Sequence, residues 1–150
     1  FVKLVNTGTI EKDTGTATAT PVGIFMGCFY TDPSTSQPTF NQMFPTGTVA
    51  DDAMAYVLDD PDAVFRMQAD GSLAQTTLGN NIAIIQTSGS TTIGRSKNAV
   101  DASTAATTDT LPLRILEFMD GPDSAVGDAF TDVLLTYNFG MHQYRNATGV

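Results

Sequence analysis

The chain has 150 residues, a length typical of one domain, and its single cysteine excludes an internal disulfide. Its net charge of −9 argues against nucleic-acid binding, because Lys and Arg supply most of the affinity for phosphates. Thr is the most frequent residue and Lys and Glu are scarce, a bias that is typical of chains built from strands and turns.

The first twenty residues predict a short strand followed by an extended arm. Residues 1–5 carry most of the large apolar side chains of this region and predict a strand. Residues 6–20 are rich in Thr and Gly and have little to bury, so we expect an extended arm or a long loop there. The predicted organisation is therefore an N-terminal arm over 1–20, one β-rich domain over 21–139 and a C-terminal tail over 140–150.

Two strands are expected next, over residues 22–30 and 39–44, and turn residues follow each of them. The first is apolar on both faces. Gly23 and Gly27 are spaced along one of these faces, which indicates close approach by another backbone. Cys28, in the middle of this run, is interpreted as a small buried apolar residue rather than a reactive thiol.

Residues 49–58 are ambiguous. Thr48 could cap a helix over this segment, whereas the same residues could form the first strand of a hairpin. The hairpin interpretation is favoured, with a turn at 59–62 and a second strand over 63–68, where apolar and polar side chains alternate.

The middle of the chain predicts one or two helical turns over 72–78, which end at Gly79, and then a compact buried strand over 82–86. Residues 87–110 consist mainly of Ser, Thr, Gly and Ala. Only Ile93 and Val100 are large apolar residues in this segment, so we expect a long surface excursion with short strands at most.

The last third contains the clearest strand patterns, over 111–119 and 131–139. In the second, Val133, Leu135, Tyr137 and Phe139 alternate with polar residues, which indicates a sheet with one buried face. About eight strands separated by turns predict a mainly β fold, an antiparallel sandwich or barrel with long Thr/Gly-rich arms and loops.

The chain lacks the usual signatures of catalysis and metal binding. A zinc site needs several Cys and His ligands, and this chain has one Cys and one His, His142. No nucleophile elbow, phosphate-binding loop or dinucleotide-binding glycine pattern is present. The Asp clusters are typical of turns and helix caps. Binding of a calcium ion between loops remains the alternative interpretation of these clusters. We therefore expect no enzyme and no cofactor, and a hydrolase with a dispersed active site around His142 is the least favoured alternative.

No stretch approaches the ~18 apolar residues of a membrane-spanning helix, and no secretory signal is recognisable. We therefore expect neither a membrane nor a nucleic acid among the partners.

Two groups of segments resemble those of small virion proteins of tailed bacteriophages, of the head decoration (cement) type. The first comprises 21–33, 46–48 and 55–65, and the second comprises 102–108, 111–116, 121–123 and 127–133. This resemblance implies a structural protein on the outer capsid surface that stabilises the shell by bridging neighbouring capsid subunits. It also implies the major capsid protein and other copies of the chain as partners, with a homotrimer favoured.

The chain ends are the predicted contact segments, because termini often become ordered only against a partner. The candidate interface residues are Phe1, Val2, Lys3, Leu4, His142, Tyr144 and Arg145. The alternative function is a host-surface or glycan-binding β-module, with or without calcium, which predicts clustered exposed tyrosines and loop carboxylates.

Overall fold

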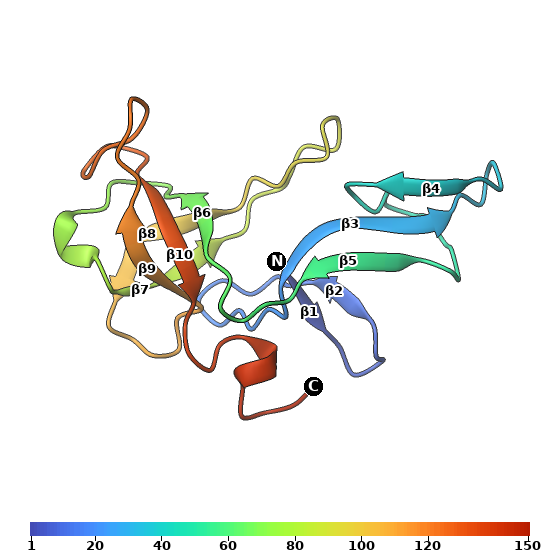
Figure 1. Cartoon of the computed structure of the whole chain (residues 1–150), viewed down its shortest axis with the longest axis horizontal. Helices are drawn as coiled ribbons and strands as arrows, with labels where there is room; N and C mark the ends of the chain where they lie inside the picture. Colours follow the sequence, from blue (N-terminus) through green and yellow to red (C-terminus); the bar gives the residue numbers. More distant parts are fainter.

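The computed structural model describes residues 1–150. Strands hold 39% of the residues and helices 4%, which confirms a mainly β fold with antiparallel sheets. Ten strands form a five-stranded, a three-stranded and a two-stranded sheet. The five-stranded sheet forms a body at one end of the molecule, and the three-stranded sheet projects from the opposite side (Figure 1). We call the latter the projecting sheet.

The five-stranded sheet has the order β6-β10-β9-β7-β8, and we call it the barrel because its two outermost strands approach each other. Its strands are β6 Phe65–Gln68, β7 Asn81–Ile85, β8 Ala99–Ala106, β9 Leu113–Phe118 and β10 Asp132–Tyr137. The two outermost strands meet where Ala69 pairs with Val100 in a parallel bridge. The Asp70 amide donates a hydrogen bond to the Val100 carbonyl at 3.0 Å. At this point the backbones of the two edge strands cover each other.

The barrel contains the main hydrophobic core, and the alternation in 131–139 identified part of it correctly. Val133, Leu135 and Tyr137 are all buried. Phe139 is 79% exposed, so its assignment to the buried face was wrong. The strand ends at Tyr137, and the chain then turns at Gly140, which adopts a positive φ of 82°. A period-two pattern places side chains only as far as the strand continues.

The projecting sheet has the order β4-β3-β5, with β3 Ile24–Thr31, β4 Pro38–Asn41 and β5 Met54–Leu58. These strands confirm the predictions for 22–30 and 39–44, and they show that the ambiguous segment 49–58 ends in a strand. The hairpin between this strand and 63–68 was wrong, because β5 pairs with β3 whereas β6 pairs with β10. The turn at 59–62 carries the chain from one sheet into another.

A junction that we call the neck joins the projecting sheet to the barrel, and it consists of residues 1–4, 21–23 and 142–145. Strand β1 Val2–Leu4 pairs with β2 Ile10–Lys12, and the Val2 amide donates to the Gly23 carbonyl at 3.0 Å. Segment 6–20 has more to bury than we predicted, because Ala19 is 1% exposed and belongs to the barrel core. A small residue in a Thr-rich segment gave no sign of this burial.

Segment 87–110 also differs from the prediction. Its second half forms β8, an eight-residue strand whose Val100 side chain is fully buried. Ala, Ser and Thr fill most of this edge strand, so it lacks the large apolar residues that mark a strand in the sequence.

The helical turn predicted for 72–78 is present as η1 Gln75–Thr77, which ends just before Gly79. No helix has the length and hydropathy needed to cross a bilayer.

Candidate protein-interaction surface

One face of the projecting sheet is covered by the chain that follows β4. Tyr30 is buried on this face, and its ring lies 5.3 Å from that of Phe44 in an edge-to-face arrangement. The Cys28 thiol donates to the carbonyls of Asn41 and Met43 at 3.5 and 3.6 Å. Burial raises the pKa of the Cys28 thiol. The interpretation of Cys28 as a buried residue is confirmed.

The opposite face has no such cover, and we call it the open face. In the strand register, Phe29 lies between Phe40 and Met54, which forms one row of side chains across the sheet. Two residues along β3, Gly27 lies opposite Tyr56 in the next row. The large side chains of the open face are Met26, Phe40, Met54, Tyr56 and Leu58, which are 43–72% exposed.

A shallow hollow of about 280 Å³ lies beside Gly27. Met26 is the extra residue of a bulge in β3, between the pairs Phe25–Val57 and Gly27–Tyr56. Gly27 itself carries no side chain, so the sheet surface drops between Phe40 and Tyr56, which both line the hollow. The open face therefore has protruding side chains in one row and a depression in the next.

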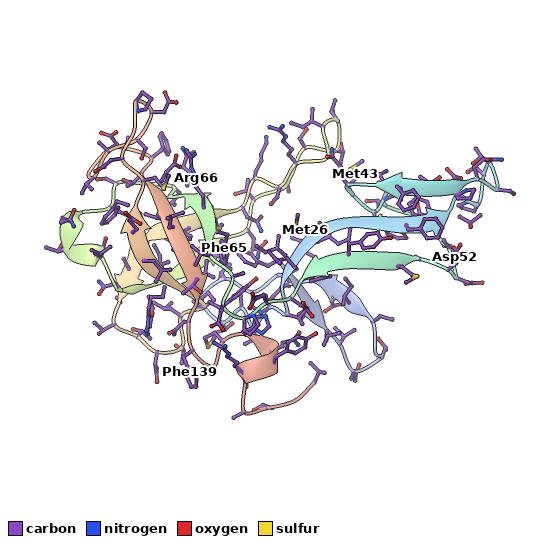
Figure 2. All side chains as sticks on the ribbon, in the orientation of Figure 1. Met26, Met43, Asp52, Phe65, Arg66 and Phe139 are labelled. Carbon is purple, nitrogen blue, oxygen red and sulfur yellow. The ribbon has the colours of Figure 1, made fainter.

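The three strands of the projecting sheet contain no charged residue, and the carboxylates lie at its two ends. At the tip, Asp52 accepts hydrogen bonds from the amide and hydroxyl of Thr31, which lower the pKa of Asp52. Figure 2 shows Asp52 at this tip and Met26 near the base of the sheet. At the side of β4, Gln42 donates to the Ile93 carbonyl of the 87–98 loop at 2.7 Å.

The predicted contact residues at the two chain ends lie together at the neck. Val2 is buried, and the Phe1 ring packs edge-on against the rings of Phe65 and Tyr137. Leu4 exchanges hydrogen bonds with the side chain of Gln143, at 2.6 and 3.0 Å. Lys3 forms an ion pair with Glu11, its neighbour across the β1–β2 pair. These contacts are within the chain, and a role of the same residues toward another protein stays a prediction.

The C-terminal candidates are held by the same junction. His142 is 1% exposed, and its Nδ1 accepts a hydrogen bond from the Tyr144 amide at 3.2 Å. Burial lowers the pKa of His142. The Tyr144 hydroxyl donates a hydrogen bond to the Asp59 carboxylate at 3.0 Å, which raises the pKa of Tyr144. Arg145 binds Asp62 through two nitrogens, at 2.7 and 2.6 Å, and this hydrogen bonding lowers the pKa of Asp62.

Neither a serine nor a carboxylate is hydrogen-bonded to His142, whose ring lies between those of Tyr137 and Tyr144. No group of three or more His, Cys, Asp or Glu side chains is placed to hold a metal ion. Several Asp residues cap their own turns instead: Asp32 accepts from the Ser34 amide and Asp60 from the Asp62 amide.

The open face was not among the predicted contact segments. Phe40, Met54 and Tyr56 have the composition of core residues, and the sequence does not show that the second layer needed to bury them is missing. The only signal was the strand over 22–30, which is apolar on both faces although just one of them is covered. Comparison of the chain with protein-family models, with curated proteins and with solved structures found no match.

Proposed function

We propose that this protein is a virion structural protein of a tailed bacteriophage, which decorates the outer capsid surface and stabilises the shell by bridging neighbouring capsid subunits. Its partners are then the major capsid protein and further copies of itself. The proposal joins the sequence resemblance to one structural observation, the open face of the projecting sheet.

The open face supports an assembly role because it leaves large apolar side chains in contact with water. Phe40 is 72% exposed, Met54 65% and Tyr56 53%. Contiguous apolar patches of this kind on a folded chain usually mark contact with another protein, because their burial is favourable by about 25 cal/mol per Å². A protein that buries such a face against neighbouring proteins is suited to a shell built from repeated subunits.

The distribution of charge is compatible with a position outside the shell. The net charge of −9 disfavours contact with packaged DNA. The uncharged strands of the projecting sheet and the acidic barrel loops give the molecule two surfaces of different chemistry. One surface can associate through apolar contacts, and the other remains available for polar contacts with a different partner.

The test is to mix the purified protein with expanded, empty capsid shells and sediment the shells. We expect the protein to pellet with the shells and to raise the temperature at which they dissociate, because each bridge must be broken before two subunits separate. Protein that stays in the supernatant, with shell dissociation unchanged, would contradict the proposal. No specific observation favours the glycan-binding alternative, since Tyr30 and Tyr137, two of the four tyrosines, are buried.

A further inference from the structure

We infer that the open face of the projecting sheet packs against the open face of a second copy, related to it by a two-fold axis that crosses the strands between the Phe29 row and the Gly27 row. The inference concerns the same surface as the proposed function and specifies what covers it. It can be tested on the protein alone, so its outcome is separate from that of the capsid experiment.

In this arrangement, the raised side chains of the open face fit the hollow on the open face of the second copy. The Phe29 and Phe40 rings lie together, with centroids 4.9 Å apart, and the hollow beside Gly27 lies one row further along. Rows two residues apart are separated by about 6.8 Å along a strand. A two-fold axis midway between the rows therefore places the aromatic pair of each copy over the hollow of the other.

The same operation brings β5 of one copy over β5 of the other. Met54 then lies opposite Tyr56 of the second copy, and Tyr56 lies opposite Met54. The flexible thioether of Met fits readily against an aromatic ring. Each contact occurs twice, as a two-fold interface requires.

The apolar area suits a reversible pair. A large side chain carries roughly 150–250 Å² of accessible surface, so the five large side chains of the open face, 43–72% exposed, present on the order of 500–600 Å². Two copies would bury about 1,000 Å² from these side chains alone, close to the lower limit of about 1,200 Å² for stable interfaces. Neighbouring Phe29 and Ile24 add to this area, so we expect weak, concentration-dependent pairing.

The effect of salt on binding distinguishes a second copy from a basic partner protein as the occupant of the open face. Two copies of a chain with net charge −9 repel each other, although no charged side chain lies on the strands that meet. Salt screens this repulsion. Pairing should therefore strengthen as the salt concentration rises, whereas binding to a basic surface would weaken.

Pairing through the projecting sheets specifies how two copies together would bridge two capsid subunits. Each barrel lies at the far end of its own projecting sheet (Figure 1). A face-to-face pair then presents two barrels at some distance from each other, and each barrel is free to contact a different capsid subunit. The resemblance implies a trimer instead, and the solution mass distinguishes the two arrangements.

The first experiment measures the mass of the protein by sedimentation at increasing concentration, in about 0.05 M and about 0.5 M salt. We expect a shift from the 15.9 kDa monomer to twice that mass, at a lower protein concentration in the higher salt. The variant Met54→Glu should stay monomeric, whereas Phe130→Glu, at a 58% exposed position on a barrel loop, should pair as the wild type does. A monomer at all concentrations, a trimer, or normal pairing by Met54→Glu would overturn the inference.

The second experiment tests the two-fold geometry. Tyr56→Lys alone should also stay monomeric, because each pair would bury two unpaired ammonium groups. A mixture of Met54→Glu and Tyr56→Lys chains should form a mixed pair, since the new Glu then lies opposite the new Lys and the second contact is native. Both positions are exposed, so in dilute protein, where the wild type is also monomeric, each variant should keep the wild-type unfolding temperature. A mixture that stays monomeric, while the wild type pairs, would show that the rows do not meet as inferred.

Discussion

Gly23 has the tightest surroundings of the glycines in this chain. A Cβ atom built on it would lie 2.3 Å from the Leu58 carbonyl oxygen and 2.7 Å from a methyl carbon of Val57. The neck brings two backbones together at this position, and the Gly23 carbonyl also accepts a hydrogen bond from Val2. The close approach that the sequence predicted at Gly23 is confirmed, and a side chain would have to separate the two segments.

We therefore expect Gly23→Ala to lower the free energy of unfolding by about 1–3 kcal/mol, the usual range for an overpacked site. Urea titration followed by circular dichroism would measure the change. Gly121→Ala is the matched control, because nothing lies within 4 Å of a Cβ atom there. Equal stability of Gly23→Ala and the control would show that the neck can relax around an added methyl group.

The C-terminal segment packs around a buried titratable group. It contains η2 Gln143–Arg145, and the buried His142 precedes this turn and accepts a hydrogen bond from the Tyr144 amide. Charged groups near its ring are Arg145, Asp59 and Asp60. Burial is the largest influence on the ring and disfavours the imidazolium form, so the pKa of His142 in the folded chain lies below its ordinary value of 6.5.

The unfolded chain binds the proton of His142 more strongly than the folded chain. Stability from this residue is therefore complete above pH 6.5 and falls as the pH drops below that value, until the folded pKa is reached. We expect His142→Phe, which keeps a ring in the site, to lose less stability than the wild type between about pH 7.5 and pH 5. Thermal unfolding at several pH values measures the difference, and parallel curves for the two proteins would contradict this assignment.

The elements that the sequence predicted well are those whose side chains alternate over a buried face. Val133 and Leu135 in β10 are examples, because their burial depends only on the strand itself. The missed strands lack that pattern: β2 has only three residues, and β8 consists mostly of Ala, Ser and Thr, although each pairs with the strand that precedes it. The open face was missed for a related reason: whether Met54 is covered depends on what packs over the sheet, which is not encoded in the alternation.

At the scale of the whole molecule, the two bodies differ in how they are stabilised. The barrel core contains twelve buried residues in contact with one another. The projecting sheet has only one covered face, where Cys28 and Tyr30 are the buried hydrophobic residues. Regions with few buried apolar contacts open locally at lower free energy than the global unfolding. The isolated molecule should therefore have a stable barrel and a less protected projecting sheet.

Hydrogen exchange tests this difference. In dilute protein we expect the amides of β3 and β5 to exchange faster than those of β9 and β10, because local opening of the projecting sheet exposes little additional apolar surface. At concentrations where copies pair, protection should rise in β3 and β5 and stay constant in the barrel. Uniform exchange across both sheets, with no dependence on concentration, would contradict both the local opening and the pairing.

The neck also determines how the molecule would respond to tension. The projecting sheet is one uninterrupted excursion of the chain, which leaves the neck at Gly23 and returns after Leu58. The hydrogen bonds between Val2 and residues 22–23 lie across the chain direction, as in antiparallel pairs. A pull along β3 would stretch these bonds together rather than one after another. The junction would then be loaded in shear, and a copy held at both ends could carry force between its two attachments before any strand detached.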